Sequence, residues 1–462
     1  MLRSMATHAE EATGIVAPGS AVKYSSEFMK AMSERGYLHQ CTGPEGLDKE
    51  MTEQKITAYL GFDATAKSLH VGSLVQIMIL RLLQKTGHTP IVLMGGGTSK
   101  VGDPSGKDKA RQLLSASDIE SNVAQMSKVF HTFLEFKPSE SCPNPAILVN
   151  NANWLNNLNY IDFLRDYGRY FSVNRMLTFD SVKMRLAREE PLSFLEFNYM
   201  ILQAYDFKHI NEKYGTILQI GGSDQWGNMV SGIELVRKSQ QVQLYGLTAP
   251  LITTSDGKKM GKSESGAVWL NRDMLSEFDY WQFWRNVADT DVNRFLKLFT
   301  ELPLDDIESL TAAGGSSLNA AKVVLADEAT KILHGEECLG KIHRTIGSLY
   351  SGASAGSSMQ LYDGDDADDY DDPMDALPEI SFADKKILGV FGEGGAATVG
   401  IDIGEALMLC RLSSSRKEGR RLIKGGGVKV NDAKVSDEFM VLDRSLFIHK
   451  GRLKLSVGKK RH

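Results

Sequence analysis

The strongest constraint on the fold is an alternation of short β-branched runs with longer helical patterns between residue 55 and about residue 300. Three strand-like runs are each followed by helical periodicity: Ile56–Gly61 before Leu69–Gln84, Pro90–Gly95 before a helix from Ser115, and Ile217–Gly221 before Met229–Lys238. Strands that alternate with helices pair in parallel and are joined by right-handed crossovers. The sequence therefore predicts an α/β fold built on a parallel sheet.

Three further segments follow the predicted sheet. Residues 304–349 carry a helical pattern, and residues 351–378 are too rich in Ser, Gly and Asp to bury a core, which indicates a linker. Near the C-terminus a helix opened by Ser415, with Glu418 at capping-box spacing, precedes β-rich residues around an Asn431–Asp432 turn. We expect an N-terminal extension over 1–22, a sheet domain over 23–270, an α-helical domain over 271–350, an acidic linker over 351–397 and a small α+β domain over 398–462.

The net charge of −5 hides a strong asymmetry between the parts of the chain. Residues 401–462 carry a net +8, which leaves −13 for residues 1–400. Eight aspartates between positions 363 and 375 supply much of that negative charge. An acidic linker therefore masks a basic C-terminal domain, which favours a nucleic-acid partner for that domain.

Other features exclude several classes of protein. No apolar run is long enough to cross a bilayer, so a membrane-spanning protein is excluded. The cysteines lie far apart without metal-ligand spacing, which predicts reduced thiols and no structural zinc: Cys41, Cys142, Cys338 and Cys410. Residues 1–20 lack the apolar segment of a secretory signal, and they argue only weakly against a mitochondrial presequence.

The first chemical motif joins a predicted strand to a predicted helix over residues 59–74, Tyr-Leu-Gly-Phe-Asp-Ala-Thr-Ala-Lys-Ser-Leu-His-Val-Gly-Ser-Leu. We expect free backbone N–H groups at the helix start, with the helix dipole, to bind a phosphate. Thr65 and His70 would be further donors, and Gly72 would leave room for a base or ribose. Taken by itself, a histidine at a helix start is more often a cap or a surface residue.

The second motif is a cationic loop at 256–263, Asp-Gly-Lys-Lys-Met-Gly-Lys-Ser. Its glycines permit movement, and its lysines would stabilise negative charge on a polyphosphate. It is not a P-loop, because Asp256 stands where the first glycine of that motif belongs. By itself, a solvated lysine loop is the more ordinary interpretation.

The two motifs taken together, His70-Val-Gly-Ser73 and Lys259-Met-Gly-Lys-Ser263, resemble the HIGH and KMSKS signatures of class I aminoacyl-tRNA synthetases. Three further segments extend the resemblance to the bacterial-type tyrosyl-tRNA synthetases: Gly95–Lys107, Tyr199–Asp206 and Gln219–Trp226. The resemblance implies a Rossmann-like parallel-sheet catalytic domain with a dimerisation insertion. An α-helical domain and a small α+β RNA-binding domain of the S-four type would follow it.

The resemblance also implies a set of tyrosine-binding residues. Tyr59 and Asp206 would bind the phenol, and Asp103, Tyr199 and Gln203 would hold the ammonium group. Gln225 would contact the carboxylate or a phosphate. Spacings of four and three residues place Tyr199, Gln203 and Asp206 on one helix face, although an ordinary partly buried face would have the same spacing.

ATP would be bound and activated by the two signature motifs, again by resemblance. The implied ATP-binding residues are Gly61, Asp63, Gly72, Gly222, Asp224 and Lys262, and the implied catalytic residues are Thr65, His70, Ser73, Lys259, Lys262 and Ser263. Ser73 stands where the HIGH signature has its last histidine, so a shorter hydroxyl donor replaces an imidazole donor there. ATP is a substrate that would bring Mg²⁺ with it, and we expect no metal bound by the protein itself. Asp224 could instead cap the following helix.

The tRNA-binding residues implied by the resemblance lie in two regions. Lys107 and Arg111 would face the acceptor end, while Arg416, Lys417, Arg420, Arg421 and Lys424 would contact tRNA(Tyr) phosphates from the C-terminal domain. A charged surface helix is the alternative for the latter group. We expect a homodimer with Phe194 near the contact, no membrane partner, and a cytoplasmic location, or the mitochondrial matrix if residues 1–22 are a presequence.

The function implied is therefore activation of L-tyrosine with ATP and its transfer to tRNA(Tyr). Two other interpretations stay open at this point. A tryptophanyl-tRNA synthetase would share the ATP motifs, but Tyr59, Asp206 and the C-terminal RNA-binding domain argue against it. A non-catalytic RNA-binding protein derived from a synthetase is disfavoured by the intact His70, Lys259 and Lys262.

Overall fold

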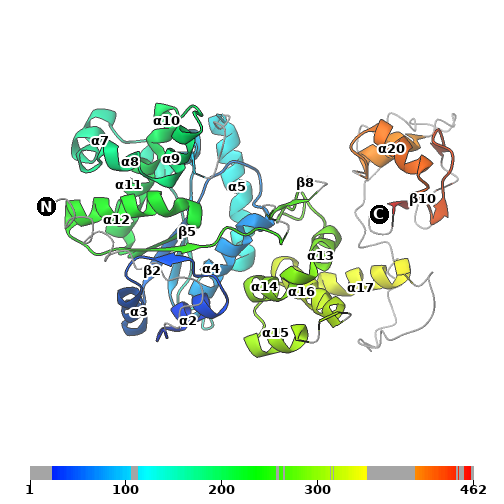
Figure 1. Ribbon diagram of the computed structural model, residues 1–462, viewed down its shortest axis with the longest axis horizontal. Coiled ribbons are helices and arrows are strands. Elements are labelled where there is room, and N and C mark those ends of the chain that lie inside the picture. The colour runs from blue at the N-terminus through cyan, green and yellow to red at the C-terminus, as the bar shows by residue number, and fades with distance from the viewer. Residues whose placement is uncertain are drawn as a thin grey trace. The chain divides into compact units, whose positions relative to one another are not determined.

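The computed structural model divides into two compact units, residues 1–339 and 340–462 (Figure 1). It describes residues 23–105, 113–255, 257, 260–263, 266–312, 314–315, 317–350, 401–410, 412–443, 446 and 452–458. The expected N-terminal extension and acidic linker lie outside the described residues.

The first unit is built on a six-stranded sheet with the order β1-β6-β5-β2-β3-β4. Its strands are β1 (Gln40–Cys41), β2 (Thr57–Phe62), β3 (Thr89–Met94), β4 (Ile147–Asn150), β5 (Leu218–Gly222) and β6 (Tyr245–Ala249). All neighbours pair in parallel except the short edge strand β1, which runs antiparallel to β6. The predicted parallel α/β sheet is confirmed. Sequence reasoning did not locate β1 or β4.

Helices cover both faces of this sheet. They are α2 (Glu27–Glu34), α3 (Pro44–Glu53), α4 (Leu74–Lys85), α5 (Ala116–Phe133), α6 (Ala152–Leu155), α11 (Tyr199–Tyr214) and α12 (Trp226–Gln240). The chain moves along the sheet in one direction through β2, α4, β3, α5 and β4, and in the other through β5, α12 and β6. Right-handed crossovers that run in opposite directions place their helices on opposite faces, so α5 and α12 flank the sheet from two sides (Figure 1).

The insertion between β4 and α11 consists of short helices. They are α7 (Tyr160–Asp166), α8 (Val173–Met176), α9 (Asp180–Ala187) and α10 (Phe194–Phe197). Their inner side chains form a small core with α11, in which Phe163, Met176 and Val182 are buried. Several large apolar side chains of the same helices remain exposed, as described below.

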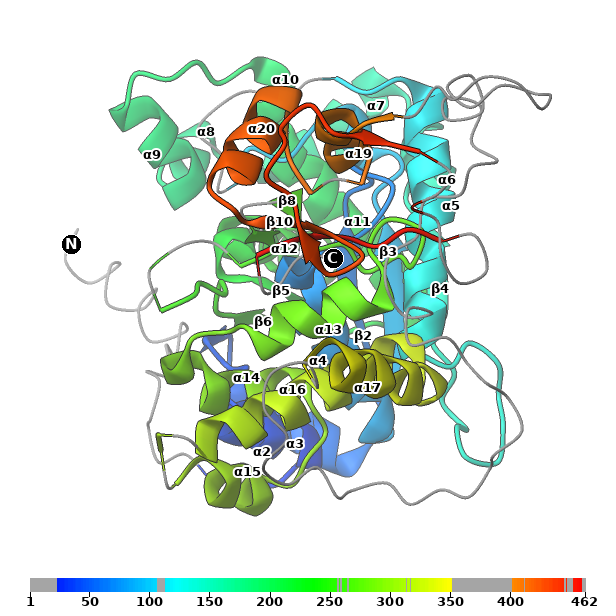
Figure 2. The ribbon, with the colours of Figure 1, turned by 90° about the vertical axis from the view of Figure 1, so that its right-hand side faces the viewer.

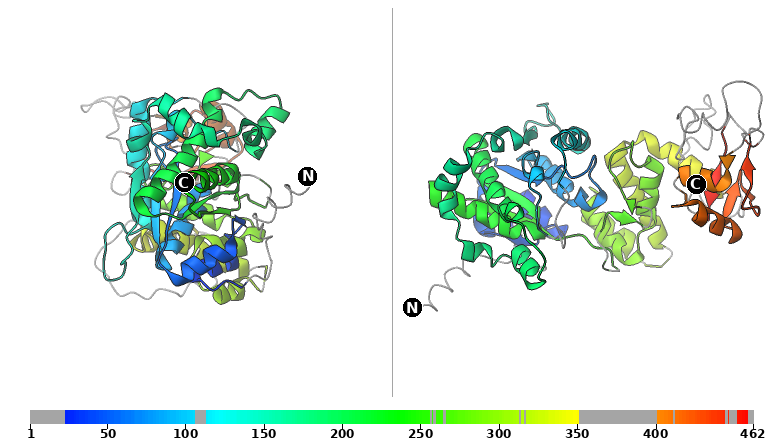
Figure 3. Two further views of the ribbon diagram at one scale, coloured as in Figure 1. Left: turned by 90° about the vertical axis from the view of Figure 1, so that its left-hand side faces the viewer. Right: turned by 90° about the horizontal axis from the view of Figure 1, so that it is seen from above.

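The first unit also contains the helices that follow the sheet. They are α13 (Glu277–Arg285), α14 (Val292–Phe299), α15 (Leu304–Thr311) and α16 (Ser317–His334), drawn in yellow-green as one group in Figure 3. Trp284 packs edge-on against Phe295 and tilted against Phe299 in their core. Residue 270, where we expected the sheet domain to end, lies inside this unit, and the domain boundaries remain predictions. Helix α17 (Glu337–Tyr350) contains the boundary between the units.

The second unit has the small α+β architecture expected from the sequence. Its elements are β9 (Ile401–Asp402), α19 (Ile403–Leu409), α20 (Arg416–Lys424), β10 (Val428–Val430), β11 (Ala433–Lys434), β12 (Val441–Leu442) and β13 (Leu455–Val457). Helices α19 and α20 pack side by side (Figure 2). The β10–β11 turn holds Asn431 and Asp432 in left-handed backbone conformations, which these residue types tolerate. Ser415 caps α20 as predicted, but Glu418 bonds Ser414 rather than completing the capping box on Ser415.

The cysteines and the lengths of the helices relate to the expectations of reduced thiols and of no membrane-spanning segment. None of the four cysteines forms a disulfide, and all but the half-buried Cys410 are buried. Burial raises the pKa of the Cys41 thiol to about 12. No helix in the described parts of the chain combines the length and the apolar character needed to cross a bilayer.

Candidate active site

The candidate site lies where the two halves of the sheet diverge. Strands β2 and β5 are neighbours, and the chain leaves them in opposite directions, so their carboxyl ends border a crevice that open α/β sheets use for ligands. A pocket of about 470 Å³ of empty space, its open mouth included, occupies this position. The side chains that line it come from β2, β5, α11 and the loops after β3, β4 and β5, and include Tyr59, Asp63, Thr98, Asn151, Tyr199, Gln203, Asp206, Gln219 and Gln225.

The inner end of the pocket is formed by Asp206 and Tyr59. Asp206 is only 1% exposed, and its carboxylate accepts hydrogen bonds from Asn151 Nδ2 at 2.9 Å and Trp154 Nε1 at 2.7 Å. Burial raises the pKa of Asp206 to about 7, although these two hydrogen bonds oppose the rise. Tyr59 is fully buried, and its hydroxyl has no hydrogen-bond partner among the described residues.

A second unsatisfied group lies beside Tyr59. Gln219 stands opposite Tyr59 in the register of the parallel strands β2 and β5, and both residues line the pocket. Its buried Oε1 also has no partner in the described part of the chain. Buried polar atoms are nearly always hydrogen-bonded, so two such atoms in one pocket indicate that a polar ligand group binds there.

The middle of the pocket is held by Asp63, the residue after β2. Its carboxylate accepts hydrogen bonds from Tyr199 Oη at 3.0 Å and Thr98 Oγ1 at 2.8 Å. Asn151 Nδ2 in turn donates to Thr98 Oγ1 at 3.0 Å. Burial, together with the charge of Asp63, raises the pKa of Tyr199 well above its usual value, so Tyr199 stays protonated and donates.

The outer wall is a network of carboxylate and amide groups. Gln225 Nε2 donates to Asp103 Oδ2 at 2.7 Å, and the Ser105 N–H donates to Asp103 Oδ1 at 2.9 Å. Asn228 Nδ2 donates to Gln203 Oε1 at 3.0 Å and lies 3.3 Å from Gln225 Oε1. Five of the six residues assigned to tyrosine binding therefore line one pocket, and Asp103 joins them through Gln225.

Sequence reasoning missed four residues of this network. Asn151 and Trp154 follow β4, Thr98 follows β3, and Asn228 lies in the first turn of α12. The run Asn150-Asn151-Ala152-Asn153-Trp154, at the end of the short apolar run Ile147–Val149, was the one signal that could have located the first two.

The segment around His70 differs from expectation. Residues Val71–Ser73 form a 3₁₀ turn rather than the first turn of α4. The Val71 N–H donates to Val268 O, the Gly72 N–H to His70 Nδ1 at 3.0 Å, and the Ser73 N–H to His70 O. The prediction of free N–H groups at this helix start is wrong for this conformation, because the protein already binds them. His70 acts as the cap, so a neutral His70 carries its proton on Nε2, the atom that can donate to a ligand.

The two signature motifs are in direct contact with each other. A Cβ atom added at Gly72 would lie 2.7 Å from the carbonyl oxygen of the buried Met260. Gly261 has a φ of +107°, and a Cβ atom there would lie 2.6 Å from His70 Nδ1. Glycine is thus required at both positions by close packing of the motifs. Trp269 forms a β-bridge with His70 just beyond.

The other residues assigned to ATP are only partly described by the structure. Gly61 and Gly222 lie near the ends of β2 and β5 and line the pocket, and Thr65 is exposed. Asp224 is not the cap of α12, because Gln225 holds that position. Lys259 lies outside the described residues, and the structure gives only the backbone of Lys262 and Ser263, in strand β7 (Lys262–Ser263), which pairs with β8 (Gly266–Ala267). In the described chain, no cluster of three or more His, Cys, Asp or Glu side chains could hold a metal ion.

The C-terminal basic helix is partly neutralised by its own domain. Arg416 pairs with Glu405 at 2.6 Å, Arg420 with Asp402 at 4.0 Å, and Lys424 with Glu438 at 3.0 Å. Exposed Lys417 and Arg421 have no ion pair among the described residues. Lys107 and Arg111 lie outside the described residues.

The insertion helices expose several large apolar side chains. Phe194 is 69% exposed, and the others are Tyr160, Ile161, Val173, Leu177, Met184, Leu186 and Leu195. Contact with another protein surface would remove these side chains from water.

Comparison with known proteins shows the family of the chain and agrees with its fold. The family "tRNA synthetases class I (W and Y)" matches residues 51–351, and the chain therefore belongs to that class of synthetases. The tyrosine–tRNA ligase of Xanthobacter autotrophicus is 51% identical over 439 residues, which cover 95% of this chain and 97% of that protein. The ligase of Zymomonas mobilis is 50% identical over 440 residues, with 95% and 98% covered. Within the class, the chain belongs to the tyrosine–tRNA ligases.

A solved structure supports the same assignment. The C-terminally truncated mitochondrial tyrosyl-tRNA synthetase of Aspergillus nidulans superposes with a TM-score of 0.63 at 30% identity. The match covers 76% of this chain and all of that one. The expected α/β synthetase fold is thereby confirmed.

Proposed function

We propose that this chain activates L-tyrosine with ATP to form tyrosyl-adenylate and diphosphate, and then transfers tyrosine to the 3′ end of tRNA(Tyr). One observation carries the proposal: the pocket at the sheet switch point ends in the buried pair Tyr59 and Asp206. The phenol of tyrosine would donate to the Asp206 carboxylate and accept from the Tyr59 hydroxyl. A ligand without the hydroxyl would leave the buried Tyr59 hydroxyl unpaired and would deprive the Asp206 carboxylate of a further donor, which is costly in a buried site.

The reaction needs positioning more than acid–base chemistry. The substrate carboxylate is already a nucleophile at neutral pH, so it can attack the α-phosphorus of ATP without a protein base. Catalysis then depends on alignment and on stabilising the charge that develops on the phosphates. His70 Nε2 and Thr65 would donate to the α-phosphate, with Ser73 beside them. Lys259, Lys262 and Ser263 would bind the departing diphosphate, and Mg²⁺ would arrive on ATP.

Binding of the two substrates divides along the pocket. Asp103, Tyr199 and Gln203 would hold the ammonium group, with Gln225 near the carboxylate. Asp63, Gly61, Gly72, Gly222 and Asp224 would contact ATP, the last through its ribose. The hydrogen bond from Tyr199 to Asp63 supports this division, since it joins a residue assigned to the ammonium group to one assigned to ATP.

Tyrosine-dependent exchange of labelled diphosphate into ATP tests the proposal directly. We expect rapid exchange with tyrosine, far slower exchange with phenylalanine, and none above background with tryptophan. Exchange with tryptophan instead would favour the tryptophanyl alternative. A folded protein without any exchange would leave only the non-catalytic RNA-binding alternative.

Transfer to tRNA would depend on the basic C-terminal domain. Lys417 and Arg421 would contact phosphates directly, whereas Arg416, Arg420 and Lys424 would first have to leave their carboxylate partners. Lys107 and Arg111 would act nearer the acceptor end. Deleting residues 398–462 is expected to abolish tRNA charging and to spare exchange, and equal loss of both activities would contradict the division of labour.

The exposed apolar side chains of the insertion suit contact with a second copy of the chain. A homodimer would bury Phe194 and its neighbours, which are costly to leave in water. Phe194→Asp should therefore yield monomers in sedimentation velocity, where the unmodified chain gives dimers. A cytoplasmic location is the simplest proposal for a relative of bacterial ligases, and mitochondrial import of a fluorescent fusion with residues 1–22 would contradict it.

A further inference from the structure

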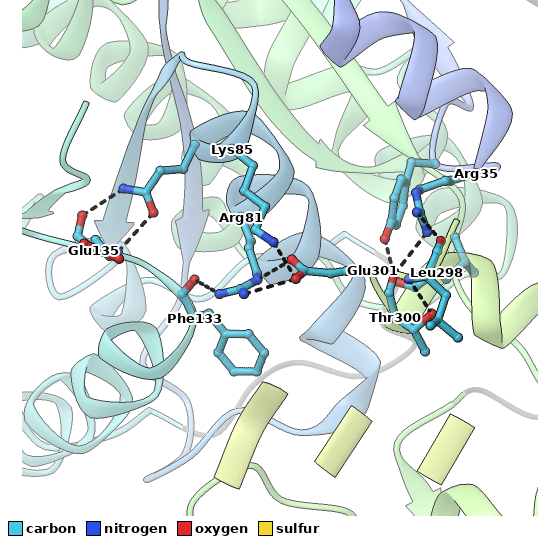
Figure 4. A network of polar contacts seen from close by, with 11 residues as sticks. Arg35, Arg81, Lys85, Phe133, Glu135, Leu298, Thr300 and Glu301 are labelled. Carbon is cyan, nitrogen blue, oxygen red and sulfur yellow. Dashed lines mark hydrogen bonds and ion pairs between the residues drawn. The ribbon is translucent and has the colours of Figure 1, made fainter. Parts of the chain in front are cut away.

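Helix α14 is fastened to the sheet part of the first unit at its C-terminal end. Arg35, which follows α2, donates to three carbonyl oxygens there: Lys297 O at 3.0 Å, Thr300 O at 3.1 Å and Leu302 O at 2.7 Å. Tyr37 Oη donates to Leu298 O at 2.5 Å (Figure 4). The last carbonyl groups of a helix have no partners within it, so these donors fix its end.

An ion-pair cluster also anchors the chain just after the C-terminal end of α14. Glu301 accepts from Arg81 Nε at 2.6 Å and from Lys85 Nζ at 2.5 Å, both on α4 (Figure 4). Burial raises the pKa of Glu301, but the hydrogen bonds from Arg81 and Lys85 outweigh it and hold the pKa below its ordinary value. Arg81 also donates to Phe133 O at 2.9 Å, which ties the cluster to α5.

The N-terminal end of α14 holds the segment that leads to the second signature motif. Asp291 is buried, and its Oδ2 accepts the Ser255 N–H at 2.9 Å. Its Oδ1 pairs with Arg294 at 2.8 Å, and Arg294 donates to Thr253 O. The N-cap residue and the first turn of α14 thus hold both the N–H and the carbonyl side of residues 253–255.

A short path links these residues to His70. The Met260 N–H donates to Ile252 O at 3.0 Å, directly before Thr253. Met260 and Gly261 pack against Gly72 and His70. A shift of residues 253–255 would therefore be passed to the contact between the signature motifs.

We propose that Asp291 and Arg294 are positioning residues for tyrosine activation: they hold the Met260–Gly261 turn against His70 from a helix whose other end is anchored to α2 and α4. The inference rests on the proposed function. Asp291 and Arg294 are absent from the pocket lining, so they act through the main chain of residues 252–255 and of Met260, whose N–H is bound to Ile252 O. Misplacing a catalytic segment by about 1 Å can cost up to a hundredfold in rate.

Steady-state exchange kinetics on the full chain test the inference, with tyrosine binding measured separately by equilibrium dialysis. We expect Asp291→Ala to lower kcat about thirtyfold, and Arg294→Ala about tenfold, while the tyrosine Kd stays within twofold. Asp291→Asn keeps an acceptor for the Ser255 N–H and should lose only about threefold in kcat.

Lys297→Ala is the matched control. Lys297 lies on the same helix, and its side chain pairs with Glu308 at 2.6 Å, away from residues 253–255. The control should keep kcat within twofold. An unaltered kcat in both alanine variants, an equal loss in Lys297→Ala, or no rescue by asparagine would overturn the inference. If Asp291→Ala fails to fold, the more exposed Arg294 decides the question. A wild-type chain without exchange overturns the proposed function as well, whereas an active wild type with unaffected variants overturns this inference only.

Discussion

The candidate site has a tyrosine half, which is the pocket, and an ATP half, which is formed by the two signature motifs. The two halves differ in which of their polar groups already have hydrogen-bond partners. In the tyrosine pocket, side chains bind one another through Asp63, Asp103 and Asp206, and the Tyr59 hydroxyl and Gln219 carbonyl are left unpaired among the described residues. At the signature motifs, the main-chain N–H groups of residues 71–73 are already bound to the protein.

This difference indicates that the tyrosine pocket determines which amino acid binds, whereas the signature motifs determine the rate of its activation. The tyrosine pocket is organised before the substrate arrives, so little ordering is required when it binds. In the ATP half the main-chain N–H groups of residues 71–73 already have partners, so phosphates would be bound there by side chains, which the contact between the two motifs positions. Rate then depends on how accurately those side chains are placed. Substitutions in the two halves should therefore affect different kinetic constants.

The largest expected effect concerns the organised half. Asp206→Ala removes the acceptor for the phenol and leaves the donors of Asn151 and Trp154 unpaired. We expect kcat/KM for tyrosine to fall about a hundredfold in the exchange assay. Phenylalanine makes no bond to Asp206, so its rate should change little, and the preference for tyrosine should narrow. An equal loss for both amino acids would contradict the assignment.

A glycine pair tests the ATP half. Gly257 and Gly261 both have positive φ, but only at Gly261 would a Cβ atom meet His70, at 2.6 Å; at Gly257 no atom lies within 4 Å. We expect Gly261→Ala to lower kcat about thirtyfold with unchanged tyrosine affinity. Gly257→Ala has a similar backbone strain and serves as the control. Similar losses in both variants would argue against the contact.

The pH dependence of binding sharpens the comparison. Because the pKa of Asp206 is about 7, lowering the pH from 8 to 6 protonates its carboxyl group and removes the acceptor for the phenol. Tyrosine affinity should fall about tenfold over that range in equilibrium dialysis. Asp206→Asn cannot titrate, and its weaker affinity should be flat. A constant wild-type affinity would contradict the carboxylate's role.

The smallest effect is expected at Asn228. Its amide donates to Gln203 and Gln225, and it is not itself assigned to substrate binding. Asn228→Ala should raise the KM for tyrosine about fivefold with little change in kcat. Asn211→Ala removes a comparable amide bond, to Thr216 O, on the neighbouring helix α11 and should leave KM unchanged. A fall in kcat for Asn228→Ala would place this residue with the ATP half.

Much of the fold could be predicted because its signals are local. The runs that became β2, β3 and β5 are apolar and are followed by glycines and helical periodicity. Strand β1 has only two residues and β4 only four, which is too short for a reliable strand pattern, so both were missed.

The site could be predicted as a set of residues, but not as a network. Asn151 and Asn228 are more than 75 positions apart and serve the pocket through contacts that only the fold creates. The expected free N–H groups at Val71–Ser73 were wrong for a related reason. Their partners are Val268, which is distant in sequence, and the His70 ring and carbonyl, whose orientation the sequence does not reveal.

The contact between Gly72 and Gly261 has a consequence for how such a chain can evolve. Nearly 190 positions separate these residues, and the contact lasts only as long as the fold of the intervening chain brings the two turns together. Neither glycine can acquire a side chain unless the opposite turn retreats. The two signature motifs are therefore expected to evolve together. Whether a substitution at one of them is tolerated depends on which residue occupies the contact position in the other.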